Sequence, residues 1–337
     1  MNGDTVRAAL IHNPHSRLNL KGAGQFLEAA QERLGGFCFS ARDQKPLVAR
    51  MRTLQEAGVN TVMIDGGDGT ISGCLTAMAQ VWPHDQLPAI AVLASGNTNL
   101  IAQDVGFGLR GVAALNRLLD GGPCPYRLRA PIRLTWPGAP ERHAVLGMFG
   151  GCAGYARAIR IAHSPTMLRY APHDLAVVLT VASSIGRLFF KRSRQEWLAG
   201  DSLRWTRPAL QGGGVGAARE RDIMRRGHSF LFLATGLEKL SYGIWPFWRE
   251  GQDGRHGFHF LNVSAFPARM GAVLYNLLRG RAPAWLRTHA DYVSGIEDQA
   301  LEMHTNSDFV MDGEVFPTPP DQRVTLERGP VFRFLHA

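Results

Sequence analysis

The amino-acid sequence predicts an α/β domain with a parallel sheet, followed by a β-sandwich-like domain. Strand-like runs alternate with helical stretches across the first third of the chain, which is typical of a parallel sheet covered by helices. From about Pro123 onward, short strands broken by Gly and Pro replace that alternation. The length of 337 residues also exceeds what one hydrophobic core usually serves, about 250–300 residues. We therefore expect two domains, over residues 1–122 and 123–337.

Each element of the first domain is bounded by a turn signal. The apolar run Val6–His12 ends at Asn13-Pro14-His15-Ser16, and a helical stretch after it stops at Gly35-Gly36. A short buried strand is followed at once by the glycines at 66 and 67. The expected elements are Val6–His12, Lys21–Leu34, Phe37–Ala41, Pro46–Ala57, Thr61–Asp65, Ile71–Val81, Ala89–Leu93 and a helix after Asn99.

The second domain is predicted to consist mainly of short strands. Two helices are expected to interrupt them, Leu175–Arg192 and Ala268–Arg279, the latter with Pro267 before it and Gly280 after it. The C-terminal segment is a candidate to pack back on the first domain. The expected strands are Tyr126–Leu134, Arg142–Gly150, Ser202–Leu210, Ser229–Ala234, Phe258–Ser264, Leu301–His304, Phe309–Met311, Val324–Leu326 and Val331–Phe334.

Composition and charge narrow the class of protein. The net charge is +9 and the pI about 9.9, which suits phosphate ligands, an anionic membrane or nucleic acid without choosing between them. No basic run carries the interleaved aromatics of an RNA-binding motif, so no nucleic-acid partner is expected. No apolar run reaches the roughly 20 residues of a membrane-spanning helix, and no signal peptide is recognised. A cytoplasmic protein is the expectation.

The turn Asp65-Gly66-Gly67-Asp68-Gly69-Thr70 is the strongest chemical signal. Glycines between a strand and a helix let the backbone approach a ligand closely, and the helix directs its positive end to the same place. Asp68 would repel a bare phosphate, so its carboxylate makes sense beside Mg²⁺ or its water shell, or beside an attacking hydroxyl. The alternative is a plain strand-to-helix turn.

Two further polar turns follow predicted strands, Asn13-Pro14-His15-Ser16 and Ser95-Gly96-Asn97-Thr98-Asn99. The carboxyl ends of parallel strands meet at one edge of a sheet, where ligands bind. Three polar turns at that edge favour a nucleotide site over three unrelated caps. None of these turns contains Lys, and the sequence has no GxxxxGKS/T string, so a P-loop is excluded.

These turns, together with a late Asp312-Gly313-Glu314, resemble the diacylglycerol kinase catalytic-domain family, which includes sphingosine and ceramide kinases. The family's NPxSG, GGDGT, GTxND-like and DGE motifs correspond to Asn13–Arg17, Gly66–Thr70, Gly96–Leu100 and Asp312–Glu314. Their order and spacing fit across nearly the whole chain. GGDGT alone is shared with NAD kinases, and the combination with NPxS and DGE is more specific. By itself, Asp-Gly also indicates a hairpin turn.

The resemblance implies a nucleotide-binding domain like that of NAD kinases and diacylglycerol kinases, with ATP and Mg²⁺ as cofactors and a lipid hydroxyl as phosphate acceptor. It implies that Glu314 is the general base, and that Asp68 organises Mg²⁺ through water and the phosphates or shares the base role. The residues implied to line ATP are Asn13, Ser16, Ser40, Gly66, Gly67, Asp68, Gly69, Thr70, Gly96, Asn97, Thr98 and Asn99.

The chain departs from the family pattern at three places that bear on metal use. Arg17 replaces a Gly, Gly73 replaces a common Glu, and Leu100 replaces the Asp of diacylglycerol-type members. The turn from Gly96 to Ala102 is closer to that of sphingosine kinases. This favours a ceramide or sphingoid-base acceptor, with diacylglycerol as the alternative.

A membrane contact is predicted on the helix Asp174–Arg194. Apolar residues and a basic end, with Arg187, Lys191, Arg192 and Arg194, suit an interfacial helix on an anionic membrane. The alternative is a helix buried against the second domain. We expect peripheral association with the inner face of the membrane and a lipid substrate. The sequence does not indicate an oligomeric state. Two rival functions stand beside the lipid kinase: a soluble-metabolite kinase of the NAD-kinase type, and a non-catalytic nucleotide or lipid binder.

Overall fold

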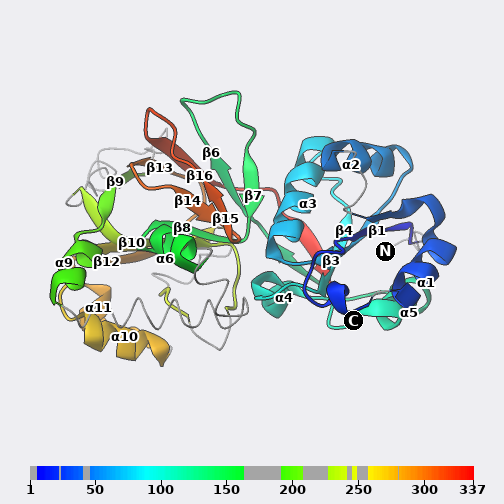
Figure 1. The fold of residues 1–337 in the computed structure, drawn as a ribbon, viewed down its shortest axis with the longest axis horizontal. Coiled ribbons are helices and arrows are strands. Elements are labelled where there is room, and N and C mark those ends of the chain that lie inside the picture. Colours follow the sequence, from blue (N-terminus) through cyan, green and yellow to red (C-terminus); the bar gives the residue numbers. More distant parts are fainter. Residues whose placement is uncertain are drawn as a thin grey trace, which may run out of the picture. The chain divides into compact units, whose positions relative to one another are not determined.

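The structure is a computed structural model that describes residues 6–22, 24–40, 46–162, 191–207, 227–240, 245–248, 257–279 and 281–337. The chain divides into two units (Figure 1). The first comprises Met1–Ala130 with the C-terminal Pro330–Ala337, and the second comprises Pro131–Gly329. Each unit has a hydrophobic core of its own.

The first unit is built on a six-stranded sheet whose first five strands run parallel. β5 closes its edge as an antiparallel partner of β17. β1, β3 and β4 are almost wholly buried, as expected for parallel strands with helices on both faces. In spatial order the strands are β2 (Cys38–Ser40), β1 (Ala8–His12), β3 (Thr61–Gly66), β4 (Ala89–Ala94), β17 (Phe332–Leu335) and β5 (Tyr126–Arg129).

Helices cover both faces of this sheet (Figure 1). On one face, Phe26 of α1 and Leu115 of α5 pack against Leu10 of β1 in one core cluster. On the other face, α2 packs on α3. The helical segments of the unit are η1 (Asn19–Lys21), α1 (Gly24–Leu34), η2 (Gly35–Phe37), α2 (Leu47–Glu56), α3 (Asp68–Val81), α4 (Leu100–Val105) and α5 (Gly111–Asp120).

The second unit is a single eleven-stranded antiparallel sheet, continuous through the pairing of β9 with β10, whose two parts form two layers. One layer holds β7, β6, β16, β13 and β9, and the other holds β15, β14, β8, β10, β11 and β12. Trp205 of β9 and Phe260 of β11 meet across the shared core, with ring centroids 5.3 Å apart. The strands are β6 (Ile132–Thr135), β7 (Val145–Gly147), β8 (Phe149–Ala153), β9 (Asp201–Thr206), β10 (His228–Thr235), β11 (Phe258–Ser264), β12 (Tyr292–Glu297), β13 (Ala300–Thr305), β14 (Phe309–Met311), β15 (Glu314–Phe316) and β16 (Arg323–Arg328).

The described helices of the second unit are α6 (Gly154–Ala162), α9 (Lys191–Ala199), α10 (Met270–Leu278) and α11 (Ala284–Arg287). Most of the helix expected at Leu175–Arg192 lies outside the described residues. Among the residues that the structure describes, no helix has the length and apolar character needed to cross a bilayer. The predicted fold class, a parallel α/β domain plus an antiparallel, sandwich-like domain, is confirmed.

Three details of the sequence-based assignment are wrong. The strand expected at Arg142–Gly150 is two strands, β7 and β8, which pair with different neighbours, β6 and β10. The single strand expected at Tyr126–Leu134 is two strands, because Pro131 lacks an N–H and interrupts the ladder. β5 therefore pairs in the first sheet while β6 pairs with β16 and β7 in the second unit. The strand β12 was not expected, because Ser294 and Gly295 dilute its apolar character.

Candidate active site

Three polar turns meet at the carboxyl edge of the parallel sheet, because β1, β3 and β4 are neighbours in it. Backbone hydrogen bonds join them. The Asn13 amide donates to the Asp65 carbonyl at 2.9 Å, and the Ser95 amide donates to the Gly66 carbonyl at 3.2 Å. Side chains add to these links, since Asn13 Nδ2 donates to Thr70 Oγ1 at 2.8 Å. The structure thus brings together the turns that the sequence predicts to share a site.

The glycine-rich turn and the turn after β4 touch through their backbones. A Cβ placed on Gly96 would lie 2.5 Å from the Gly67 Cα, which is closer than real side chains approach. A Cβ on Gly66 would meet Thr70 at 2.7 Å. Glycine is therefore needed at Gly96 for the two turns to pack, and at Gly66 for the glycine-rich turn to close on Thr70. Main-chain N–H groups in turns of this kind are a common means of holding phosphate.

Asp68 is the first residue of α3, yet its carboxylate caps the N-terminus of α4. Its Oδ2 accepts the Leu100 amide and its Oδ1 accepts the Ile101 amide, both at 3.0 Å. These are the first two amides of α4, where helix N–H groups lack partners within the helix. Burial raises the pKa of the Asp68 carboxyl, against the lowering effect of the two amide hydrogen bonds.

Asn99 does not cap α4 with its side chain. It adopts a left-handed backbone with φ 49°, which Asn tolerates better than most residues. Its amide group turns back to Gly96, where Oδ1 accepts the Gly96 amide at 2.8 Å and Nδ2 donates to the Gly96 carbonyl at 2.9 Å. Asn99 therefore stiffens the turn, and the carboxylate of Asp68 supplies the cap.

The other residues predicted to line ATP lie at the same edge in differing environments. Asn97 and Thr98 are exposed at the tip of the turn, Ser16 is buried, and Gly69 lies in the first turn of α3. Ser40 ends β2 and pairs with His12, and its side chain lies outside the described part of the chain. Gly106-Phe107-Gly108-Leu109-Arg110-Gly111 has GxGxxG spacing, but it links α4 to α5 and so lacks the strand-to-helix context of a dinucleotide site.

A buried carboxylate, Asp65, lies beneath the three turns and was not predicted as a site residue. His12 Nδ1 is 2.7 Å from Asp65 Oδ2, and Asn19 Nδ2 donates to the same oxygen at 3.0 Å. The Ser95 hydroxyl donates to Asp65 Oδ1. Both Asp65 and His12 are buried. A charged residue ending an apolar strand, directly before the glycines, is the sequence signal that identifies this position.

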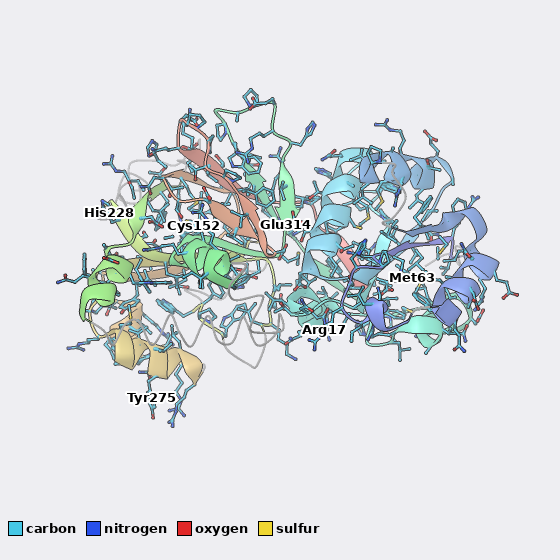
Figure 2. The ribbon with its side chains drawn as sticks, in the orientation of Figure 1. Arg17, Met63, Cys152, His228, Tyr275 and Glu314 are labelled. Atoms are coloured by element: carbon cyan, nitrogen blue, oxygen red, sulfur yellow. The ribbon has the colours of Figure 1, made fainter. Side chains whose placement is uncertain are left out.

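The same network extends to the exposed Arg110. Its Nη2 donates to the Ser95 hydroxyl at 3.0 Å. Since Ser95 gives its single proton to Asp65, its lone pairs accept from Arg110. The Leu18 amide also donates to the Ser95 carbonyl at 3.1 Å, which brings the segment containing Arg17 beside the same turn. Figure 2 shows Arg17 in the loop after β1.

Replacing Asp65 by Asn is expected to destabilise the first unit and loosen all three turns. A single amide oxygen cannot accept from His12, Asn19 and Ser95, and breaking a buried charged network costs about 3 kcal/mol. Misplaced turns should weaken the binding of ATP, the nucleotide expected at this edge, about 10- to 100-fold. Thermal unfolding and ATP titration measure both effects. Asp120→Asn, an exposed carboxylate paired with Arg33, is the control that should alter neither; an unchanged Tm for Asp65→Asn would contradict the role of the network.

In the second unit, Asp312-Gly313 forms the turn of the β14–β15 hairpin. Their φ values, 47° and 88°, are positive as in tight two-residue hairpin turns. Asp312 also anchors the hairpin, because its Oδ2 accepts the Met148 amide at 2.8 Å and its Oδ1 accepts the Phe149 amide at 3.0 Å. The motif is therefore a hairpin turn whose Asp is occupied by backbone amides.

Glu314 begins β15 beside this turn (Figure 2) and is exposed. Desolvation by the surrounding protein atoms raises the pKa of its carboxyl. Strand β8 packs closely between β14 and β10. A Cβ on Gly150 would lie 2.6 Å from the Val310 carbonyl oxygen, and a Cβ on Gly151 would lie 2.2 Å from the Phe232 carbonyl oxygen. These contacts fix the hairpin while its Glu stays accessible.

The predicted membrane residues fall at the border of what is described. Arg187 lies outside the described residues, and Lys191, Arg192 and Arg194 belong to α9 with side chains that are likewise not described. Within the described part of the chain, no three His, Cys, Asp or Glu side chains gather as a metal site.

Comparison with known proteins agrees with this architecture. Residues 7–128 match the family model described as diacylglycerol kinase catalytic domain. A diacylglycerol kinase from Bacillus anthracis str. Sterne has a similar structure, with a TM-score of 0.56, 13% identity and coverage of 100% of this chain and 99% of that one. A second protein from the same organism, provisionally assigned as a diacylglycerol kinase, gives a TM-score of 0.58, 15% identity and 98% coverage of both chains.

No curated protein sequence matches the chain. At these identities the two structures show a common fold over the whole chain. The family model covers the segment that carries the NPxS, GGDGT and GTxND-like turns. The resemblance to the diacylglycerol kinase catalytic-domain family is thereby confirmed, and residues 7–128 are the part of the chain that matches its catalytic-domain model.

Proposed function

We propose that the protein is an ATP-dependent lipid kinase, which transfers the γ-phosphate of ATP to a hydroxyl of a membrane lipid. One observation carries the proposal: the three family turns form a single hydrogen-bonded cluster at the carboxyl edge of the parallel sheet. The close approach of Gly67 and Gly96 leaves main chain without side chains there, and α3 starts directly after the first of these turns. Such an edge of a parallel sheet suits the phosphates of a nucleoside triphosphate.

The donor set of the turns also fits Mg²⁺. Each oxygen of the Asp68 carboxylate accepts one amide and retains a further lone pair. Mg²⁺ usually keeps several waters and is held by one or two carboxylates together with substrate phosphates. Asp68 is therefore the residue proposed to hold it, directly or through water. The ion would supply charge neutralisation on the phosphates.

Arg110 is assigned as the residue of the chain that supplies positive charge to the phosphates. The three turns contain no Lys, whereas the Ser95 hydroxyl holds the guanidinium of Arg110 beside the second glycine turn. One of its five N–H donors serves Ser95, and the planar group suits phosphate oxygens. We assign Asp65 and Ser95 as positioning residues for Arg110, and Arg110 as a residue that contacts phosphate.

Glu314 is assigned as the general base that takes the proton of the acceptor hydroxyl. A lipid hydroxyl is a weak nucleophile, so a carboxylate that takes its proton during transfer assists the reaction. Glu314 is accessible, and its hairpin is fixed by Asp312. The class of acceptor lipid is inferred from the turn after β4. Its likeness to the corresponding turn of sphingosine kinases favours a ceramide or sphingoid base over diacylglycerol. Access to such substrates implies peripheral association with the inner face of an anionic membrane, for which Arg187, Lys191, Arg192 and Arg194 are proposed contacts.

A transfer assay with radiolabelled ATP tests the proposal. The full chain is incubated with Mg²⁺ and mixed micelles that contain diacylglycerol, ceramide or sphingosine, and with NAD as a separate acceptor. Label in one lipid is the expected result, and its identity decides between glycerolipid and sphingolipid. Label in NAD alone would reassign the protein as a soluble-metabolite kinase.

The cap formed by Asp68 favours a second candidate, a nucleotide-binding protein without transfer activity. Both of its carboxylate oxygens already serve α4, which is a sufficient structural reason for a carboxylate at this position. Binding of ATP without label in any lipid would favour this candidate. The accessible Glu314 is the reason for ranking the kinase above it.

A further inference from the structure

A strongly basic segment without acidic residues connects β11 to β12 in the second unit. Residues 265–290 contain four arginines, Arg269, Arg279, Arg281 and Arg287, and neither Asp nor Glu. All four arginines are exposed. The segment includes α10 and α11. Its charge is therefore of one sign and faces solvent.

The same segment exposes large apolar side chains. Phe266 is 58% exposed, Tyr275 55% and Leu274 37%, whereas Val273 on the inner side of α10 is buried. Figure 2 shows Tyr275 pointing away from the strands of its unit. The sequence of α10, MGAVLYNLL, contains Asn276 as its single polar side chain apart from the Tyr275 hydroxyl. A helix that is apolar on its outer side normally meets a partner.

The start of the segment is tied to the sandwich. The Ala268 amide donates to Asp291 Oδ2 at 3.0 Å, and the Tyr292 hydroxyl donates to the Ala268 carbonyl at 2.7 Å. The Phe266 amide donates to the Leu198 carbonyl of α9 at 2.8 Å. These hydrogen bonds fix the start of the segment to the second unit. It lies next to α9, whose sequence begins with Lys191-Arg192-Ser193-Arg194.

We propose that this face, the α10 surface (Phe266, Arg269, Leu274, Tyr275, Arg279, Arg281 and Arg287), docks on an anionic lipid bilayer. Arginines beside outward-facing Phe, Leu and Tyr are the composition of an interfacial helix on acidic lipid headgroups. The guanidinium of Arg279 lies 4.5 Å from the centroid of the Tyr275 ring, so one cation and one amphipathic ring are presented together. The inference rests on the proposed function only in that a membrane lipid is the acceptor.

Sedimentation with vesicles, without ATP, tests the α10 surface separately from catalysis. The full chain is mixed with vesicles of phosphatidylcholine alone or of phosphatidylcholine with phosphatidylglycerol. Binding to the anionic vesicles is expected, and added salt should weaken it. Arg279→Ala with Arg281→Ala should weaken partitioning about thirtyfold, since each basic residue near such a surface contributes about 1 kcal/mol. Leu274→Ser with Tyr275→Ser should weaken it at least about tenfold.

Matched variants elsewhere serve as controls. Tyr126→Ser with Leu128→Ser removes a Tyr and a Leu of similar exposure, 49% and 52%, from β5. Arg52→Ala with Arg204→Ala removes two exposed arginines, from α2 and β9. Both controls should bind like the unaltered chain, and thermal unfolding verifies that every variant is folded. Absence of binding to anionic vesicles, or undiminished binding by the folded α10 variants, would overturn the proposal whether or not the transfer assay succeeds.

Discussion

Replacing Glu314 by glutamine is expected to slow phosphoryl transfer to lipid by about 10²- to 10⁴-fold, the usual contribution of a general base. The variant keeps the shape of the side chain and removes only its ability to take a proton. Because Asp312, not Glu314, anchors the β14–β15 hairpin to Met148 and Phe149, the fold and the binding of ATP should be unchanged. Initial rates under saturating ATP measure the effect on kcat.

The pH dependence separates a base from a merely structural Glu314. Desolvation raises the pKa of its carboxyl, so the carboxyl stays protonated to a higher pH than an ordinary glutamate. A general base works only when deprotonated, hence kcat should fall as the pH drops through this raised pKa. A rate profile extended to acidic pH should show that limb. In Glu314→Gln, the residual rate should lack it.

Glu302→Gln is the matched control for this experiment. Glu302 is an exposed glutamate on β13 of the same unit, and it has no assigned part in the site. Its rate and its pH profile should equal those of the unaltered protein. A kcat for Glu314→Gln within about threefold of the Glu302→Gln value would remove Glu314 from the mechanism, because a general base contributes far more than that.

The sequence predicted that the three polar turns lie at one edge of the sheet, because each turn is a local feature of the chain. Each turn directly follows an apolar strand, and parallel pairing brings such turns to one edge whatever the details of packing. The glycines at 66, 67 and 96 were recognisable for the same reason. Their mutual contact was not, because the approach of Gly67 to Gly96 depends on two segments almost thirty residues apart.

The hydrogen-bond partners of the charged residues could not be predicted from local pattern. Asp68 was expected beside metal and phosphate, whereas the contact that the structure shows is the cap on α4. Asp65 was treated as part of a strand, although it joins donors from η1 and from the ends of β1 and β4. The formation of β12 also depends on long-range pairing. Gly295 lies opposite Phe260 of β11, and the Phe260 ring would be 3.0 Å from a Cβ at Gly295. Such context overrides the weak strand propensity of Ser and Gly.

Replacing Asp68 by asparagine is expected to damage both the fold of the site and its chemistry. An amide oxygen can accept from Leu100 or Ile101 but not from both, because the other atom becomes an N–H donor. One amide of α4 then loses its cap, which costs about 1–2 kcal/mol and should lower Tm. If the carboxylate also holds Mg²⁺ at the phosphates, kcat/KM should fall by about 10²- to 10³-fold more.

The two effects of Asp68→Asn can be separated by temperature and by Mg²⁺. Well below the Tm of the variant, the chain is folded and a pure capping role would leave transfer nearly normal. A role at the metal would instead leave transfer slow at every temperature and would raise the Mg²⁺ concentration needed for half-maximal rate. Asp85→Asn, at an exposed carboxylate after α3, should change neither Tm nor Mg²⁺ dependence. We expect Asp68→Asn to show the lower Tm together with the altered Mg²⁺ dependence; a lower Tm alone would reduce Asp68 to a helix cap and favour the non-catalytic reading of the site.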